Sequence, residues 1–353
     1  MALRIGIMKG NGIGPEITSA TQRVLEATGL PLQWEDIPVA DEAVELFGHP
    51  LPPQTVEKLR EVKYTIKAPF IVNKMQGRIA CTQLDGSQIT YPTINNAVRR
   101  ELKLFVNPRP IQGYPGISGR HEAMDLVVMR EITEDVYIGH EHTIGDDDMA
   151  AEAIKLTTRA AATRVARYSF DYARRHGRKR VTCLHKANVL NFTDGLFLRC
   201  FREVAAAYPD IQADDMMIDA ACYVVVRDPR RFDVVVTANQ YGDIFSDLAA
   251  GLAGSLGLAP GANIGDEAFV YEASHGAAPD IAGKGIANPL ALVLSAAVLL
   301  DQTGHGTEAQ AVRSAVRHVV ETREALTPDL GGTGTTRSLT DAVVAEVKRI
   351  VSS

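Results

Sequence analysis

The chain has 353 residues, of which 46% are hydrophobic and 23% are charged, and it carries a formal net charge of −6 with a pI near 5.9. This is an ordinary globular composition with enough length for a large core and more than one lobe. The acidic balance excludes a global basic surface for nucleic acid, and no stretch approaches the ~20 consecutive apolar residues that span a bilayer, so we expect neither partner.

Strand patterns alternate with helical patterns along the chain. Pro15 stands in the first turn of a predicted helix, Gly177 closes a long helix with a basic last turn, and Ser338-x-x-Asp341 is typical of a helix cap. In chain order, the pattern predicts a strand at 3–9, a helix at 15–28, strands at 62–69 and 125–131, a helix at 158–177, strands at 179–187 and 232–239, and helices at 288–304 and 338–351. This alternation predicts an α/β architecture, and no linker marks a lobe boundary.

The four cysteines are widely spaced and form no C-x-x-C pair. Their spacing argues against a zinc knuckle and a disulfide framework, and it favours a reducing, cytoplasmic location.

Two carboxylates interrupt an apolar helical pattern near the middle of the second half. Asp243 and Asp247 stand four residues apart, so their side chains share one face of a helix and repel each other. A divalent cation such as Mg²⁺ or Mn²⁺ would relieve that repulsion, because hard oxygen ligands suit both ions. The alternative is that Asp243 caps the helix after Gly242 and Asp247 points to solvent. Spacing alone leaves both interpretations open.

Several other side chains have two interpretations on residue chemistry alone. Arg99, Arg109 and Arg130 each have two interpretations: a guanidinium beside a strand end can bind a carboxylate at two points, or it can form a surface ion pair. Tyr137 is either a packed aromatic residue or a proton donor, and Asp219 is a third carboxylate in an apolar setting.

A long motif chooses between these interpretations. The segment NQYGDIFSDLAAGLAGSLGLAPGANIG resembles the signature N-x-x-G-D-x-x-S-D of the β-decarboxylating dehydrogenases, the isocitrate and 3-isopropylmalate dehydrogenase family. The resemblance extends from GNGIGPEI to TPDLGGTGTT, nearly the whole chain. It implies a two-lobed, isopropylmalate-dehydrogenase-like α/β fold with a sheet shared across the lobes and helices on both faces. Residues 1–104 with 254–353 would form the large cofactor-binding lobe, and 105–253 the small lobe with the dimer interface and the metal aspartates.

The resemblance also implies an active site shared between two copies of the chain. Asp243 and Asp247 would hold Mg²⁺ or Mn²⁺ together with Asp219 of the other copy, which would also supply Lys186 to act at the hydroxyl being oxidised. Tyr137 would protonate the enol left after decarboxylation. The positions that match substrate contacts are Thr93, Asn95, Arg99, Arg109, Arg130 and Asn188.

The segment YEASHGAAPDIAGKGIANP resembles the adenosine loop of the same family. Asp280 and Ile281 match the positions that select NAD or NADP. A carboxylate there can accept hydrogen bonds from both ribose hydroxyls and would repel a 2′-phosphate, so we predict NAD. The positions that match cofactor contacts are Glu272, His275, Gly276, Ala278, Asp280, Ile281 and Asn288.

The expected substrate is a 3-substituted (R)-malate. Isopropylmalate enzymes place an apolar pair where this chain has Asn95 and Asn96, whose amides an isopropyl group would leave unpaired. Thr93-x-Asn95 is closer to the S-x-N of isocitrate enzymes, so we expect isocitrate to be converted to 2-oxoglutarate. Alternatives are homoisocitrate, tartrate, a phosphonate analogue of isocitrate, 3-isopropylmalate, or a non-catalytic regulatory subunit. The family's Thr-Thr-Pro phrase is missing from the long loop 70–92, which in the family closes over the substrate, so its rewriting suggests an altered specificity. Asn11 replaces a family aspartate, and we assign no mechanism to that change.

Overall fold

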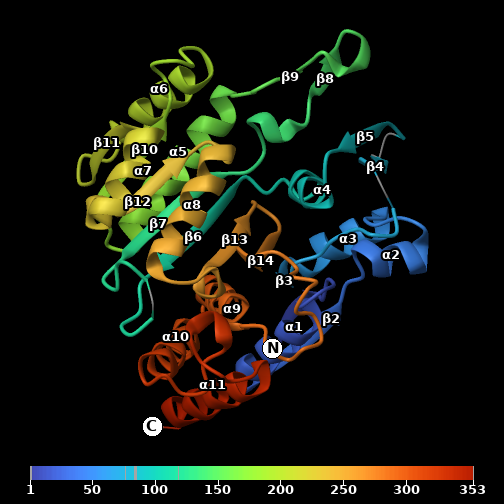
Figure 1. Cartoon of the computed structure of the whole chain (residues 1–353), viewed down its shortest axis with the longest axis vertical. Coiled ribbons are helices and arrows are strands. Elements are labelled where there is room, and N and C mark those ends of the chain that lie inside the picture. Colours follow the sequence, from blue (N-terminus) through green and yellow to red (C-terminus); the bar gives the residue numbers. More distant parts are fainter. Residues whose placement is uncertain (1, 76, 83–85, 118, 353) are drawn as a thin grey trace. The chain divides into compact units, whose positions relative to one another are not determined.

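The computed structural model describes residues 2–75, 77–82, 86–117 and 119–352 (Figure 1). The chain divides into two compact units. Unit 1 consists of Met1–Gln76, Pro110–Met124 and Ala250–Ser353, and unit 2 of Gly77–Arg109 and Asp125–Ala249.

Ten strands form a large central sheet, and the strand β6 contains the boundary between the units, at residues 109 and 110. The predicted α/β fold class is confirmed. The hydrogen-bonded order is β11 (Gln212–Met217), β10 (Arg180–His185), β12 (Val234–Thr237), β7 (Asp125–Glu131), β6 (Val106–Gln112), β13 (Pro260–Ile264), β14 (Phe269–Ala273), β3 (Tyr64–Lys67), β1 (Leu3–Met8) and β2 (Leu32–Asp36).

Unit 1 packs helices on both faces of its strands. The strongly apolar α9 contacts β3, β13 and β14 and is flanked by α1 and α10, while α3 contacts β1 and β3. The helices of this unit are α1 (Gly14–Glu26), α2 (Ala40–Phe47), α3 (Pro53–Val62), α9 (Leu290–Gln302), α10 (Gly306–Glu321) and α11 (Thr336–Val351), with short 3₁₀ turns η4 (Leu256–Leu258) and η5 (Pro328–Leu330).

Unit 2 packs α5 and α6 against each other and against its parallel strands, and α7 contacts β10 and β11. Its helices are α4 (Ile94–Glu101), α5 (Arg159–Arg175), α6 (Thr193–Ala205), α7 (Ile218–Arg227) and α8 (Asn239–Ala253), with 3₁₀ turns η1 (Val136–Ile138), η2 (Asp146–Asp148) and η3 (Pro229–Arg231). The last residues of α8, from Ala250 onward, belong to unit 1. Two hairpins, β4 (Ile79–Thr82) with β5 (Gln88–Tyr91) and β8 (Glu141–Ile144) with β9 (Ala150–Ala153), complete it. The β8–β9 hairpin projects from the rest of unit 2 (Figure 1).

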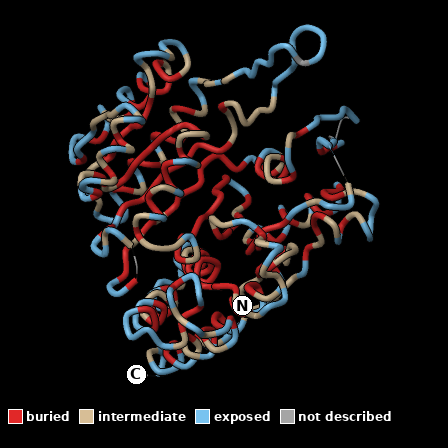
Figure 2. Tube along the Cα trace, viewed as in Figure 1, coloured by how far each residue is buried: buried red, intermediate tan, exposed pale blue. Residues whose placement is uncertain are grey.

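Burial follows the sheet. Strands β7, β10 and β12 consist almost entirely of buried residues, because parallel strands are covered on both faces (Figure 2). Every predicted strand and helix has a counterpart in the structure. No helix among the described residues has the length and apolar character needed to cross a bilayer. All four cysteines are free thiols.

One predicted helix boundary is wrong. The terminal helix α11 begins at Thr336 and not at the predicted Ser338 cap. Thr335 is the N-cap residue, and Ser338 occupies the third helical position, where its hydroxyl reaches back to the Thr335 N–H at 2.8 Å. In a capping box the third helical residue also bonds back to the N-cap residue, so Ser338 takes part in the cap without being the N-cap itself. The predicted helix start therefore lies two residues too late.

The two units differ from the expected lobe boundaries at three segments, residues 77–104, 110–124 and 250–253. Residues 77–109 belong to unit 2, because α4 and the β4–β5 hairpin are bonded to it; for example, Arg78 Nη1 donates to the Gly139 carbonyl at 2.9 Å. Residues 110–124 belong to unit 1, where Arg323 contacts the Gly116 carbonyl.

Candidate active site

The parallel strands of unit 2 end in one row, which positions the polar side chains that follow them. The register pairs Thr237 of β12 with Arg130 of β7 on one side and with Leu184 of β10 on the other. The carboxyl ends of neighbouring parallel strands are the usual place for a site in an open α/β sheet. Arg130, Lys186 and the start of α8 therefore stand at one edge.

Arg130 is buried and anchored to the first turns of α8. Its Nε donates to Asn239 Oδ1 at 2.9 Å, and its Nη1 contacts Asp243 Oδ1. Glycine is required at position 242, because a Cβ there would lie 2.6 Å from Arg130 Cγ. The Gly-Asp pair of the signature thus lets the strand arginine approach the helix and meet the carboxylate.

Asp243 does not cap a helix. Helix α8 begins at Asn239, so Asp243 lies in its second turn, and the alternative of an N-cap is wrong. Burial raises the pKa of Asp243, but the charges of Arg130 and Arg109 outweigh burial and hold that pKa below its usual value. Asp243 is therefore ionised at neutral pH.

Asp247 and Asp243 both lie close to the Arg109 guanidinium. Arg109 Nη1 lies 3.3 Å from Asp243 Oδ1 and 3.4 Å from Asp247 Oδ1, and it donates to Ser246 Oγ at 2.7 Å. The Asp247 side chain is 50% exposed, and burial of the remainder raises its pKa. The two carboxylates thus share one face of α8, as the four-residue spacing predicted, and Arg109 supplies a counter-charge to both.

Tyr137 points its hydroxyl at the same cluster. It follows β7 in the turn η1, and its OH donates to Asp243 Oδ2 at 2.8 Å. The Arg130 guanidinium stacks 5.2 Å from the centre of its ring. Burial and the hydrogen bond to Asp243 raise the pKa of Tyr137, so the phenol stays protonated at neutral pH and can serve as a proton donor.

Lys186 and Asp219 form a separate pair. Lys186 Nζ donates to Asp219 Oδ1 at 2.6 Å, and the Asp219 side chain is largely exposed at the start of α7. The described residues contain no group of three His, Cys, Asp or Glu side chains arranged to hold a metal. One chain therefore does not bring Asp219 together with Asp243 and Asp247.

The predicted substrate residues on α4 lie in unit 2 with the arginines. Thr93 is the N-cap of α4 and accepts from Asn96 N–H at 3.2 Å, and Arg99 is buried on the same helix. Asn95 Oδ1 is a buried acceptor without a partner in the described part of the chain. Asn188 is exposed in the loop after β10. An unpaired buried amide oxygen is costly, and a polar ligand atom would satisfy it.

Unit 1 holds the predicted cofactor residues around the end of β14. Glu272 is buried, with Lys67 Nζ 2.5 Å from Oε2 and Asn263 Nδ2 2.8 Å from Oε1. Next in the chain, Ser274 Oγ and His275 Nε2 are buried and find no partner within the described residues. Burial lowers the pKa of His275, which favours a neutral ring able to bond a ligand.

The remaining predicted cofactor residues, in the loop 276–288, differ in how far they are buried. Gly276 and Asp280 are exposed, Ile281 is half-buried, and Ala278 has φ +40°. Asn288 is buried and uses its amide within the protein, donating to Asp329 Oδ2 at 2.9 Å and accepting from Leu290 N–H at 2.9 Å. These hydrogen bonds hold the end of the loop in place, just before α9.

The structure supplies a reason for Asn11. Its side chain accepts from Ile71 N–H at 2.8 Å, and its amide donates to the Ile71 carbonyl at 2.5 Å and to Asp41 Oδ2 at 3.3 Å. An aspartate would lose both donated bonds and repel Asp41. Asn11 and Asp41 thus fasten the first residues of the rewritten loop 70–92, of which 76 and 83–85 lie outside the described residues.

Comparison with known proteins identifies the family to which this chain belongs. The family model Isocitrate/isopropylmalate dehydrogenase matches residues 4–343. The chain belongs to the isocitrate/isopropylmalate dehydrogenase family. It is 45% identical to a 3-isopropylmalate dehydrogenase of Archaeoglobus fulgidus over 93% of this chain and 94% of the relative.

Two further relatives extend the comparison. The NAD isocitrate dehydrogenase catalytic subunit 5, mitochondrial, of Arabidopsis thaliana is 40% identical over 96% of this chain and 86% of its own. The crystal structure of isocitrate dehydrogenase from Methylococcus capsulatus superposes with a TM-score of 0.91 at 43% identity, covering 99% of this chain and all of that one. The protein is a decarboxylating hydroxyacid dehydrogenase that acts on a 3-substituted malate.

For this family member, sequence reasoning assigned no role to several residues that hold the site. Asn239 and Ser246 stand inside the signature, and their spacing could have indicated that they orient Arg130 and Arg109. Lys67, Asp135 and Lys155 carried no local signal, because their partners lie far away in the sequence. Only the tertiary structure pairs them.

Proposed function

We propose that this protein catalyses the NAD-linked, Mg²⁺- or Mn²⁺-dependent oxidative decarboxylation of isocitrate to 2-oxoglutarate. The observation that carries the proposal is the convergence of Arg109, Arg130, Asp243, Asp247 and Tyr137 at one edge of the unit 2 sheet. Two carboxylates on one helix face are a suitable oxygen set for a hard divalent cation. The guanidinium groups beside them suit a polycarboxylate substrate.

Charge supports binding of such a substrate. Burial, Arg109 and Arg99 together lower the pKa of Arg130 to about 9, so the three arginines lie within electrostatic reach of one another and Arg130 stays cationic at neutral pH. Asp243 and Asp247 compensate part of this charge. The surplus of cations favours anionic groups of the substrate over neutral ones.

The chain's residues then have distinct tasks. A bound divalent ion would polarise the hydroxyl and carbonyl oxygen, and NAD would accept the hydride. Arg99, Arg109 and Arg130 orient the substrate carboxylates. Lys186 of a second copy accepts the hydroxyl proton through water, and Tyr137 returns a proton to the carbon that loses CO₂.

Isocitrate is preferred because of the polar residues at the start of α4. The unpaired Asn95 Oδ1 and the Thr93 hydroxyl suit a polar substituent. The carboxylate of isocitrate has no proton to donate, so a bridging water would donate to it and to Asn95 Oδ1. An isopropyl group would leave the amide unsatisfied, at a cost of about 1–3 kcal/mol. Homoisocitrate, tartrate and a phosphonate analogue remain alternatives with the same chemistry.

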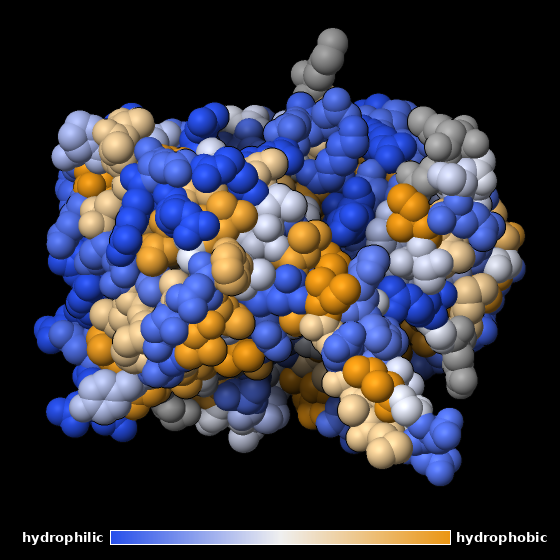
Figure 3. Space-filling model, turned by 90° about the horizontal axis from the view of Figure 1, so that it is seen from above, coloured by the Kyte–Doolittle hydropathy of each residue, from blue (hydrophilic) through white to orange (hydrophobic). Residues whose placement is uncertain are grey.

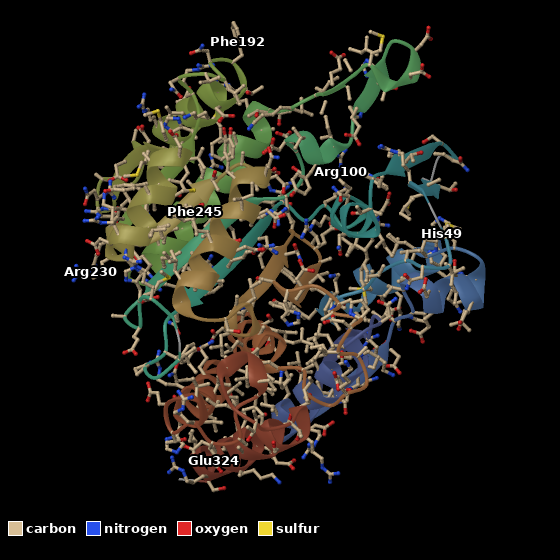
Figure 4. All side chains as sticks on the ribbon, in the orientation of Figure 1. His49, Arg100, Phe192, Arg230, Phe245 and Glu324 are labelled. Atoms are coloured by element: carbon tan, nitrogen blue, oxygen red, sulfur yellow. The ribbon has the colours of Figure 1, made fainter. Side chains whose placement is uncertain are left out.

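A homodimer is proposed to complete each active site. Apolar side chains are exposed close in sequence to Lys186 and Asp219, namely Val189, Phe192, Met217 and Tyr223. Figure 4 shows Phe192 at the outer margin of unit 2. Figure 3 shows hydrophobic residues on a largely hydrophilic surface. A second copy that covers these groups would bring Lys186 and Asp219 to Asp243.

We propose a cytoplasmic location from the free cysteines.

The test is a panel of 3-substituted malates with NAD⁺ or NADP⁺ and Mg²⁺ or Mn²⁺. We expect isocitrate with NAD⁺ to have the highest kcat/KM, at least about tenfold above 3-isopropylmalate, which corresponds to the cost of one unpaired amide. Higher turnover of another malate would replace isocitrate within the same reaction class. The absence of turnover with every compound would favour the regulatory-subunit alternative.

NAD selectivity is expected to depend on Asp280. The double substitution Asp280→Lys with Ile281→Tyr removes the acceptor for the ribose hydroxyls and adds a cation for a 2′-phosphate. Because a hydrogen bond to a charged group contributes about 1.5–3 kcal/mol, kcat/KM for NAD⁺ should fall about 10- to 100-fold while that for NADP⁺ rises. Steady-state kinetics with both cofactors measure this.

The matched control is Glu267→Lys, which makes the same charge change at an exposed position of unit 1 in the β13–β14 turn. It should leave both values within about twofold, since surface changes away from a site have small effects. An unchanged preference for NAD⁺ in the double variant would contradict the proposed role of Asp280.

A further inference from the structure

Lys155 is a largely buried cation that lies between two buried carboxylates of unit 2. Its Nζ lies 2.9 Å from Asp194 Oδ1 and 3.5 Å from Asp135 Oδ1, and 4.2 Å from the centre of the Tyr241 ring. The lysine side chain is 13% exposed, and the carboxylates of Asp135 and Asp194 are 1% and 3% exposed. At this depth each anion depends on a paired charge and on hydrogen bonds.

Asp135 holds the turn that carries Tyr137. Its Oδ1 accepts from Val136 N–H at 2.8 Å, at the start of that turn. Its Oδ2 accepts from Gln240 N–H at 2.9 Å, in the first turn of the helix that carries Asp243. Asp135 adopts φ +71°, a conformation unfavourable for a residue with a side chain, which persists only where its surroundings fix it. The carboxylate therefore sets the placement of Tyr137 against α8.

Asp194 holds the loop that carries Lys186. It lies in the first turn of α6, and its Oδ2 accepts from the Lys186 N–H at 2.7 Å. Its other oxygen, Oδ1, receives no well-aligned hydrogen bond within the described residues, so the Lys155 ammonium balances it by charge at 2.9 Å. Removing that ammonium would leave the buried Asp194 carboxylate without a charge partner, while it still accepts from the backbone N–H of Lys186.

We propose that Lys155 is a positioning residue that fixes the Tyr137 turn and the Lys186 loop at the same time. This inference rests on the proposed function, in which Tyr137 serves the chain's own active site and Lys186 serves that of the second copy. One buried cation thereby ties the geometry of two active sites together. It contacts no substrate itself; it acts through Asp135 and Asp194.

The test compares Lys155→Met, which keeps the length and removes the charge, with Lys155→Arg, which keeps the charge. For Lys155→Met we expect kcat to fall about 100-fold, because misplacement of catalytic groups by about 1 Å has effects of that size. KM, and the Kd of the Mg²⁺–substrate complex measured by calorimetry, should stay within about threefold. Lys155→Arg should recover at least about a tenth of the wild-type kcat.

Arg178→Met is the matched control for stability. Arg178 also bridges two carboxylates of unit 2, Asp125 at 2.7 Å and Asp233 at 3.0 Å, and its side chain is 20% exposed. It lies before β10, at the opposite end of that strand from Lys186. Its substitution should lower Tm, though less than Lys155→Met does because Asp125 is 52% and Asp233 24% exposed, while kcat stays within about twofold. A loss of ion pairs by itself would then not account for a loss of turnover.

Double-mutant cycles test whether Lys155 acts through both catalytic groups. In a Tyr137→Phe background, and separately in a Lys186→Met background, the additional Lys155→Met change should lower kcat less than about tenfold, because residues that act as a unit are not additive. Additive effects in both backgrounds would overturn the proposal.

Two further outcomes decide the matter. If the wild-type enzyme is active and the Lys155→Met variant has an unchanged kcat, or shows only a higher KM, this inference is overturned and the proposed function is intact. If the wild type is inert towards the whole substrate panel, the proposed function is overturned first. If Lys155→Met does not fold, Asp194→Asn replaces it, since it keeps an acceptor for Lys186 N–H and removes one charge of the cluster. We then expect kcat to fall about tenfold at unchanged KM, and an unchanged kcat overturns the proposal.

Discussion

Replacing Asp247 by asparagine is expected to lower Mg²⁺-dependent turnover about 1,000-fold without lowering Tm. Such a loss corresponds to about 4 kcal/mol of transition-state stabilisation, of the size that a bound metal supplies. Burial raises the pKa of Asp247 in the folded protein, so its ionised form destabilises the fold once the pH rises above that pKa. Removing the charge relieves that cost, and Tm should stay constant or rise.

The measurements are kcat/KM at several Mn²⁺ concentrations, Mn²⁺ binding by calorimetry and thermal unfolding. Asp228→Asn is the matched control, because the Asp228 side chain is also 50% exposed and also contacts one arginine, Arg230 at 2.8 Å. It should change neither binding nor turnover. An Asp247→Asn enzyme with wild-type turnover at all metal concentrations would refute a metal at this helix face, as would unaffected wild-type turnover after chelation.

Mixing two inactive variants is expected to restore activity. Tyr137→Phe and Lys186→Met should each lose about 100- to 10,000-fold in kcat, the usual contribution of a general acid or base. In a mixed dimer one of the two sites would receive both an intact Tyr137 and an intact Lys186. With random pairing, about a quarter of the wild-type sites should return. Co-expression with two affinity tags, followed by purification of the mixed dimer, measures this directly.

Complementation is expected because Lys186 and Tyr137 belong to different clusters within one chain. Lys186 pairs with the largely exposed Asp219, whereas Tyr137 pairs with Asp243. A chain that carries both substitutions should abolish both sites of a mixed dimer with wild type, whereas sites built within one chain would keep half of the activity. Failure of complementation in dimers shown to be mixed would mean that Lys186 serves its own chain.

Much of the site followed from local sequence. The signature around Asp243 and Asp247 fixes its own spacing, because residues four apart on a helix face the same way whatever surrounds them. The strand that carries Arg130 and the strand that precedes Lys186 each contain a short, mostly apolar run, which is typical of buried parallel strands. The polar residues at their carboxyl ends could therefore be predicted to gather at one edge.

Other features depended on contacts between distant residues. The sequence by itself determined the α/β alternation, the family signature and the identity of the charged side chains. Only the tertiary structure decided that α8 begins before Asp243 and that α4 belongs to unit 2. The tertiary structure alone also placed Lys155 between Asp135 and Asp194. A buried ion pair joins residues with no fixed spacing along the chain, and its partners are selected by packing and by the cost of leaving a charge unpaired, neither of which leaves a local pattern.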